Sequence, residues 1–327
     1  MATQTTGATP HEPQIEDELP HPWSDAPEWQ ESVCCWFLDP ATDVGGFLRW
    51  GVHPNAGFGR LDLFAFDPDQ RFRRVDERVR LDVDSSAATL DVGSASAGVD
   101  DAGAVTYLWR EPECDADLRF DGFYAPHGFG GAGDRNLQQG IYTGHLECSG
   151  RVTGALRIGD ATHEVDALAH RDRSWGPRRI DMVHTNRMFT GTMGPALSFS
   201  ANVIQTVDGT ANKVGFVVRD GVHTPVVDME ILPVIHLDGY SVESGRARLL
   251  LEGGEVLTIH AETIAGQLTP WDGYLCSDHI SRAWCGDLTG FCDNELTNNP
   301  RLGTAPPPFL QFVDGGDGLS AHPSRPF

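Results

Sequence analysis

Residues 170–178 combine a histidine, an aspartate, a serine, a tryptophan and three arginines, and so carry side chains suited to acid–base chemistry. They follow the alternating segment 165–169, which predicts that a β-strand continues into them. Successive side chains of a strand point to opposite faces, so His170, Asp172 and Ser174 are expected to share one face. A carboxylate two positions from a histidine on one face can exchange protons with a ligand.

The same alternation places Arg171, Arg173 and Trp175 on the opposite face. The Gly-Pro pair at 176–177 ends the strand, because proline has no N–H to donate to a neighbour. We expect the two arginines and Arg178 to form structural ion pairs. An ion-pair cluster at a strand end is also the alternative to a catalytic site, since structural networks gather charge as well.

The rest of the chain predicts an all-β fold. Residues 45–52 and 60–66 have strand character, and no amphipathic helical pattern is longer than about three turns. A hairpin is expected where residues 154–158 and 162–169 flank Gly159-Asp160, with glycine at the first position of a type II′ turn. Similar hairpins recur in the second half, for example around residues 220–221. The expected architecture is two barrel-like domains packed together.

With 327 residues, the chain exceeds the usual size of a single core. We expect residues 1–20 to form a flexible leader, 21–178 an N-terminal β domain and 179–327 a C-terminal β domain.

Charge and hydropathy restrict the partners. Acidic residues outnumber basic ones 47 to 24, which gives a formal charge of −23 and argues against nucleic acid or an anionic membrane. No apolar run approaches the roughly 18 residues of a membrane span, and the N-terminus lacks a signal-peptide core. The prediction is a cytoplasmic protein whose oligomeric state is open, and the preference for arginine over lysine suggests a bacterial source.

No cofactor or metal is expected. Residues 128–133 match G-x-G-x-x-G by letter but lack the preceding strand and following helix of a dinucleotide site, so a mobile loop is the better interpretation. Cys276, Cys285 and Cys292 with His279 match no compact zinc spacing, and buried free thiols are the expected state.

Four aromatic residues are candidates for the wall of an apolar site: Tyr124, Tyr142, Trp175 and Phe189. Core filling is the alternative explanation for them. A barrel of about eight strands nevertheless leaves room for one small ligand, and aromatic walls around a few polar groups are typical of such sites.

The stretch 170–178, together with 150–159 and 45–49, resembles the bacterial carotenoid 1,2-hydratases (hydroxyneurosporene synthases). The resemblance implies two lipocalin-like domains and cofactor-free hydration. Asp172 matches the aspartate thought to protonate the alkene, whereas His170 stands where the family tends to have tyrosine. Related sequences include hydratases of isoprenoid or prenylated substrates and also pericyclases.

The predicted function is therefore a cofactor-independent hydratase that adds water to, or removes it from, a C=C bond of an apolar isoprenoid or prenylated substrate. Either Asp172 with a raised pKa is the acid, or a protonated His170 donates the proton while Asp172 holds it. Trp175 or Tyr142 would stabilise the cation through its π face. An arginine that keeps Asp172 ionised would instead make Asp172 a base.

Two other classes remain open. A pericyclase or isomerase would use the same site mainly to fold its substrate, and a lipocalin-like carrier would bind apolar ligands without turnover.

Overall fold

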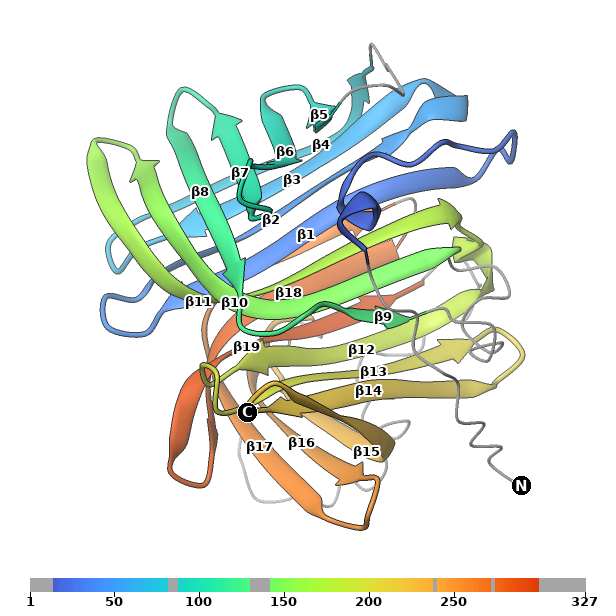
Figure 1. Ribbon diagram of the computed structural model, residues 1–327, viewed down its shortest axis with the longest axis vertical. Helices are drawn as coiled ribbons and strands as arrows, with labels where there is room; N and C mark the ends of the chain where they lie inside the picture. The colour runs from blue at the N-terminus through green and yellow to red at the C-terminus, as the bar shows by residue number, and fades with distance from the viewer. Residues whose placement is uncertain (1–13, 82–87, 130–141, 238–239, 272–273, 300–327) are drawn as a thin grey trace. The chain divides into compact units, whose positions relative to one another are not determined.

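The computed structural model describes residues 14–81, 88–129, 142–237, 240–271 and 274–299. Contacts divide the chain into two compact units between Ile180 and Asp181. Both units are built from antiparallel strands, which confirms the predicted all-β fold with two lipocalin-like domains (Figure 1). None of the helical segments in the described part of the chain has the length and apolar character of a membrane-spanning helix.

The first unit is an eleven-stranded sheet in the order β4-β3-β2-β1-β11-β10-β8-β7-β6-β5, with β9 paired to β10. Its elements are η1 (Ile15–Glu18), β1 (Trp29–Asp39), β2 (Val44–His53), η2 (Pro54–Ala56), β3 (Phe58–Phe66), β4 (Arg71–Arg80), β5 (Leu90–Val92), β6 (Ala95–Val99), β7 (Val105–Arg110), β8 (Cys114–Gly122), β9 (His127–Phe129), β10 (Gly144–Ile158) and β11 (Ala161–Pro177). The central strands β1, β11 and β10 carry the residues of interest.

This sheet curls back on itself. The indole N–H of Trp50 on β2 donates to the Leu90 carbonyl on β5 at 2.9 Å, although the two strands lie far apart in the sheet order. The curl encloses a core that includes Val33 and Cys35 of β1 and Cys148 of β10. One face of β1, β10 and β11 therefore points into the hydrophobic core, and the other points away from it.

The second unit is a closed barrel in sequence order. It follows η3 (Ile180–Met182) and consists of β12 (Val183–Thr192), β13 (Ser198–Thr206), β14 (Ala211–Arg219), β15 (Val222–Ile235), β16 (Val242–Leu251), β17 (Val256–Trp271), β18 (Tyr274–Cys285) and β19 (Leu288–Asn298). The strands β12 and β19 pair and close the barrel. Its interior is apolar and contains Phe189, Phe199 and Cys292.

Two of the predicted hairpins are present with the expected turn chemistry. Ile158 pairs with Ala161 across Gly159-Asp160, and Gly159 alone of the two turn residues has a positive φ, of 57°, as a type II′ turn requires. Between β14 and β15 both Asp220 and Gly221 have positive φ, which is typical of a type I′ turn. These short turns fix the register of the strands they join.

The segment before β1, residues 14–28, makes polar contacts with side chains on the core face of the first unit. Residues 1–13 of the predicted leader lie outside the described residues, whereas Ile15–Glu18 forms a 3₁₀ turn. The buried Arg171 of β11 donates to both carboxylate oxygens of Glu18, with Nη1 at 3.0 Å from Oε2. Its guanidinium carbon also lies 5.1 Å from the centre of the Phe120 ring.

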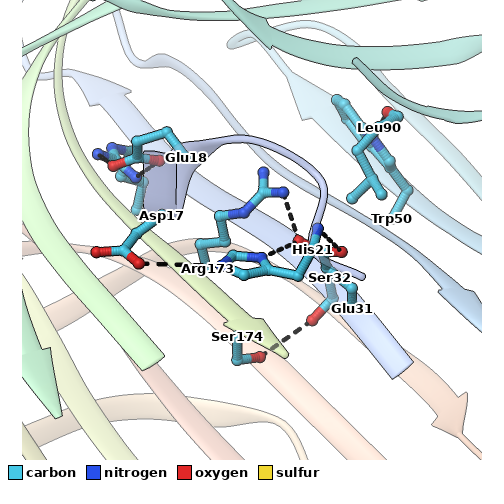
Figure 2. Close-up of polar contacts among 10 residues, drawn as sticks. Asp17, Glu18, His21, Glu31, Ser32, Trp50, Leu90, Arg173 and Ser174 are labelled. Carbon is cyan, nitrogen blue, oxygen red and sulfur yellow. Dashed lines mark hydrogen bonds and ion pairs between the residues drawn. The ribbon is translucent and has the colours of Figure 1, made fainter. Parts of the chain in front are cut away.

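A second buried ion pair continues this attachment. Arg173 donates to Oε1 of Glu31 at 2.5 Å, and the backbone N–H of His21 donates to Oε2 of the same carboxylate at 3.0 Å (Figure 2). The His21 ring lies 2.8 Å from Glu31 Oε1 and stacks on Trp175 with 3.8 Å between ring centres. Strand β1 begins at Trp29, shortly before Glu31, so both partners of the Arg173–Glu31 pair lie on paired strands of the sheet.

We expect Glu18→Ala to destabilise the first unit by about 3 kcal/mol, because it leaves the Arg171 charge buried without its partner. Urea denaturation followed by tryptophan fluorescence measures the change. The matched control is Asp166→Ala, which removes an arginine pair that lies on the surface with 56% and 58% of the two side chains exposed. Equal stability of the two variants would contradict this role for Glu18.

Candidate active site

The pairing of β10 with β11 brings two polar triplets together on the face that points away from the core. The register joins His145 to Ser174, Glu147 to Asp172 and Ser149 to His170. Each strand thus supplies histidine, carboxylate and serine at alternate positions, and the two triplets run in opposite directions. Directly opposed residues of an antiparallel pair have Cβ atoms about 4.5–5.5 Å apart, so the six side chains form one cluster.

His170 is held firmly within this cluster. Its side chain is 0% exposed, with Nδ1 2.8 Å from the Ser149 hydroxyl and Nε2 3.3 Å from Oε2 of Glu147. Both ring nitrogens therefore have protein partners. The ring also lies beside Trp36 of β1, at 6.3 Å between ring centres.

His145 lies between the two carboxylates. Its Nε2 is 3.4 Å from Oδ2 of Asp172 and 3.5 Å from Oε1 of Glu147. The rings of Tyr142 and Phe129 flank it, with centres at 4.9 and 5.2 Å. Nδ1 of His145 is buried and has no hydrogen-bond partner among the described residues, whereas both ring nitrogens of His170 have one.

Asp172 is held as a carboxylate. Burial acts to raise its pKa, but His145, the Cys34 thiol and the charge of Arg178 outweigh burial and lower the pKa below its ordinary value. Its side chain is 16% exposed, and Oδ1 has no hydrogen-bond partner among the described residues. Such a group accepts a proton at neutral pH and does not supply one.

Arginine side chains lie along the same face on β2 and β3. Arg49 lies 3.3 Å from the buried Asp62 carboxylate, which Arg60 also contacts at 3.3 Å. Arg178, just after β11, donates to the Ser174 hydroxyl at 2.5 Å. Burial, together with the neighbouring Arg49, lowers the pKa of Arg178 to about 10, so it remains a cation at neutral pH.

The structure separates the residues of 170–178 as strand alternation predicts. Asp172 and His170 contact the polar side chains of β10, whereas Arg171 and Arg173 pair with Glu18 and Glu31 on the core face. Trp175 lies against His21 on that core face as well. The tryptophan is therefore not beside Asp172.

The other aromatic candidates are distributed differently. Tyr142 is beside His145, and the Tyr124 hydroxyl accepts a hydrogen bond from the Ser149 backbone N–H at 2.8 Å. Phe189 belongs to the second unit, where it is fully buried in the barrel interior next to Phe199. Of these four aromatic candidates, only Tyr142 is in ring contact with the histidine–carboxylate cluster in the described part of the chain.

Sequence reasoning missed His145 and Glu147. The available signal was the alternation His-x-Glu-x-Ser at 145–149, which mirrors His-x-Asp-x-Ser at 170–174. Residues 130–133 of the glycine-rich stretch lie outside the described residues, so the expected mobile loop stays a prediction.

The model of a family described as a domain of unknown function (DUF7064) matches residues 14–300. No curated protein matches the chain. The resemblance to carotenoid hydratases therefore stays a prediction.

Several solved structures share the fold at low sequence identity. An AttH-like protein from Nitrosomonas europaea superposes with a TM-score of 0.62 at 13% identity, over 83% of this chain and 92% of the other. CghA with Sch210972 gives a TM-score of 0.60 at 12% identity, over 83% and 88%. Kievitone hydratase from Nectria haematococca gives 0.53 at 9% identity, over 84% and 90%.

The lowered pKa of Asp172 predicts a pH dependence of stability. A carboxyl group with a lower pKa in the folded than in the unfolded state stabilises the fold above its unfolded value, near 3.8, and this contribution is lost as the pH falls through the folded pKa. The free-energy difference between wild type and Asp172→Asn should therefore shrink as the pH is lowered from 5 towards 2. Urea denaturation at several pH values measures it. A difference that grows on acidification would show that Asp172 is protonated in the folded protein.

Proposed function

We propose that this chain, which belongs to the family described as a domain of unknown function (DUF7064), is a cofactor-independent acid–base enzyme that hydrates a C=C bond or performs the reverse dehydration. The observation that carries the proposal is the placement of His145 between Glu147 and Asp172, with Nδ1 lacking a hydrogen-bond partner among the residues that the structure describes. This arrangement places a proton carrier between two carboxyl groups.

In the proposed mechanism the protonated His145 donates the proton from Nδ1 to an alkene carbon, and the electron pair of the C=C bond forms the new C–H bond. The adjacent carbon becomes a cation. Tyr142 stabilises it through its π face, by about 2 kcal/mol when the site excludes water.

Water then attacks the cation, and its surplus proton passes to Oδ1 of Asp172, the oxygen that lacks a hydrogen-bond partner among the described residues. Asp172 then releases this proton to solvent and Nδ1 of His145 takes one up from solvent, which restores the starting state, while Nε2 keeps its proton towards Asp172 throughout. Asp172 thus acts as a base in this proposal, because its lowered pKa does not suit the role of acid. His170 and Ser149 position Glu147, the second carboxylate beside His145.

The proposed substrate is apolar, with an isoprenoid or prenyl group. Support comes from the resemblance of residues 170–178 to the carotenoid hydratases and from the fold shared with kievitone hydratase. A pericyclase or isomerase is the second candidate, and the fold shared with CghA favours it. A carrier would have no need for a histidine placed between two carboxyl groups.

The test incubates the full chain in H₂¹⁸O with a panel of isoprenoid and prenylated aromatic alkenes, with products read by mass spectrometry. We expect an ¹⁸O-labelled alcohol, and a loss of at least about 100-fold in rate for His145→Gln and for Asp172→Asn, because each removes one step of proton transfer.

The control for this experiment is His163→Gln. His163 lies on β11, the strand of Asp172, but near its other end, where it pairs with Asp67 at 2.9 Å. The turnover rate of this variant should therefore equal that of wild type. Isomerised product without label would support the pericyclase or isomerase class. Binding without turnover would support the carrier, and labelled product formed equally by His145→Gln would overturn the assignment of the acid.

A further inference from the structure

A second cluster of ionisable side chains lies on β18 and β19 of the second unit, on the sheet face opposite to the one that carries the core residues Ala283 and Cys292. Ligand atoms of Cys276, Asp278 and Glu295 lie within 4.8 Å of one another. Cys276 and Asp278 are only 7% and 2% exposed. The register of β18 with β19 sets Cys276 opposite Thr297 and Ile280 opposite Asp293, so these side chains share one sheet face with Glu295.

Independent polar groups point to a ligand at this place. Gln267 of β17 pairs with Asp278 in the neighbouring ladder, is 5% exposed, and neither its amide oxygen nor its amide nitrogen has a hydrogen-bond partner among the described residues. Asp293 is fully buried, and its Oδ2 is also without a hydrogen-bond partner there, while Oδ1 accepts from the His279 N–H at 2.9 Å. Buried polar groups of this kind are costly unless something satisfies them.

Acidic side chains are concentrated at the same place, because Asp278, Asp293 and Glu295 lie on one sheet face. The Cys276 thiol donates to Asp278 Oδ2 at 3.8 Å. A divalent cation placed there would supply the missing counter-charge and replace the thiol proton.

We propose that Cys276, Asp278 and Glu295 form a site for a divalent cation of the zinc type, with Asp293 and Gln267 completing its surroundings. One sulfur and two carboxylates are donors that Zn²⁺ accepts. Glu295 Oε1 accepts hydrogen bonds from Asn186 and Thr297, both at 2.9 Å, which orient the carboxylate. Ligand atoms in a tetrahedral zinc site are about 3.5 Å apart, so the side chains must close by about 1 Å on binding.

The binding step is not a redox reaction. The Cys276 S–H bond breaks, a sulfur–metal bond forms, and the proton passes to the buffer. Both ring nitrogens of His279 already have protein partners. Nε2 accepts from the Val242 N–H at 3.0 Å, and Nδ1 lies 3.2 Å from the Asn294 carbonyl. The proposed donor set therefore differs from any set built on His279 and the three cysteines of the second half.

The test titrates the reduced full chain with Co²⁺ as a spectroscopic probe. We expect one equivalent to bind with a sulfur-to-cobalt charge-transfer band in the near ultraviolet, and Zn²⁺ to displace it. The band should vanish in Cys276→Ser and persist in Cys285→Ser, a control on the same strand whose cysteine is more exposed and would attract adventitious metal first.

Asp278→Asn serves as a second variant in case Cys276→Ser does not fold, and should weaken Co²⁺ binding at least about tenfold while leaving the band visible at high metal concentration. Zn²⁺ should also raise the Tm of the wild type and of Cys285→Ser but not of Cys276→Ser. Absence of the band in the wild type, or its persistence in Cys276→Ser, would overturn the proposal.

Discussion

The register between β10 and β11 is the constraint on which the rest of the first unit depends. The two-residue turn at Gly159-Asp160 sets it, and it then runs without a break from Ile158–Ala161 to Gly144–Trp175. A slip of one residue would move every side chain of β11 to the other face of the sheet. Core packing, the attachment of the N-terminal segment and the histidine–carboxylate cluster would all be lost together.

Strand β11 separates two buried charge systems by alternation alone. Arg171 and Arg173 on the core face are neutralised by Glu18 and Glu31, while Asp172 on the opposite face interacts with His145 and Arg178. Each buried charge requires a partner, because an isolated ion in a protein interior costs several kcal/mol. The core-face pairs fasten the chain before β1, so the N-terminal segment is part of the structure that holds β11 in place. On the opposite face, Nδ1 of His145 and Oδ1 of Asp172 have no hydrogen-bond partner within the described ranges, and the proposed chemistry takes place there.

Local sequence patterns predicted the all-β fold, the hairpin at 159–160 and the two faces of 170–178, since these depend on near neighbours and strand alternation. The partners of those residues could not be predicted from the sequence. Glu18 and His145 approach β11 only through pairing or packing across the sheet, and no spacing rule relates their positions. The direction of the Asp172 pKa shift was equally inaccessible, because burial and the His145 contact act in opposite directions. The sequence grouped Cys276 with other cysteines, because spacing alone does not show that it lies beside Glu295 of the adjacent strand.

Transfer of a proton from solvent through His145 to carbon is the central claim, and an alkene turned over in D₂O tests it most directly. The account predicts that each product molecule carries one deuterium on the protonated carbon, on a single face, and that His145→Gln abolishes this labelled product. Product without deuterium, or the same stereospecific labelling in His145→Gln, would contradict it.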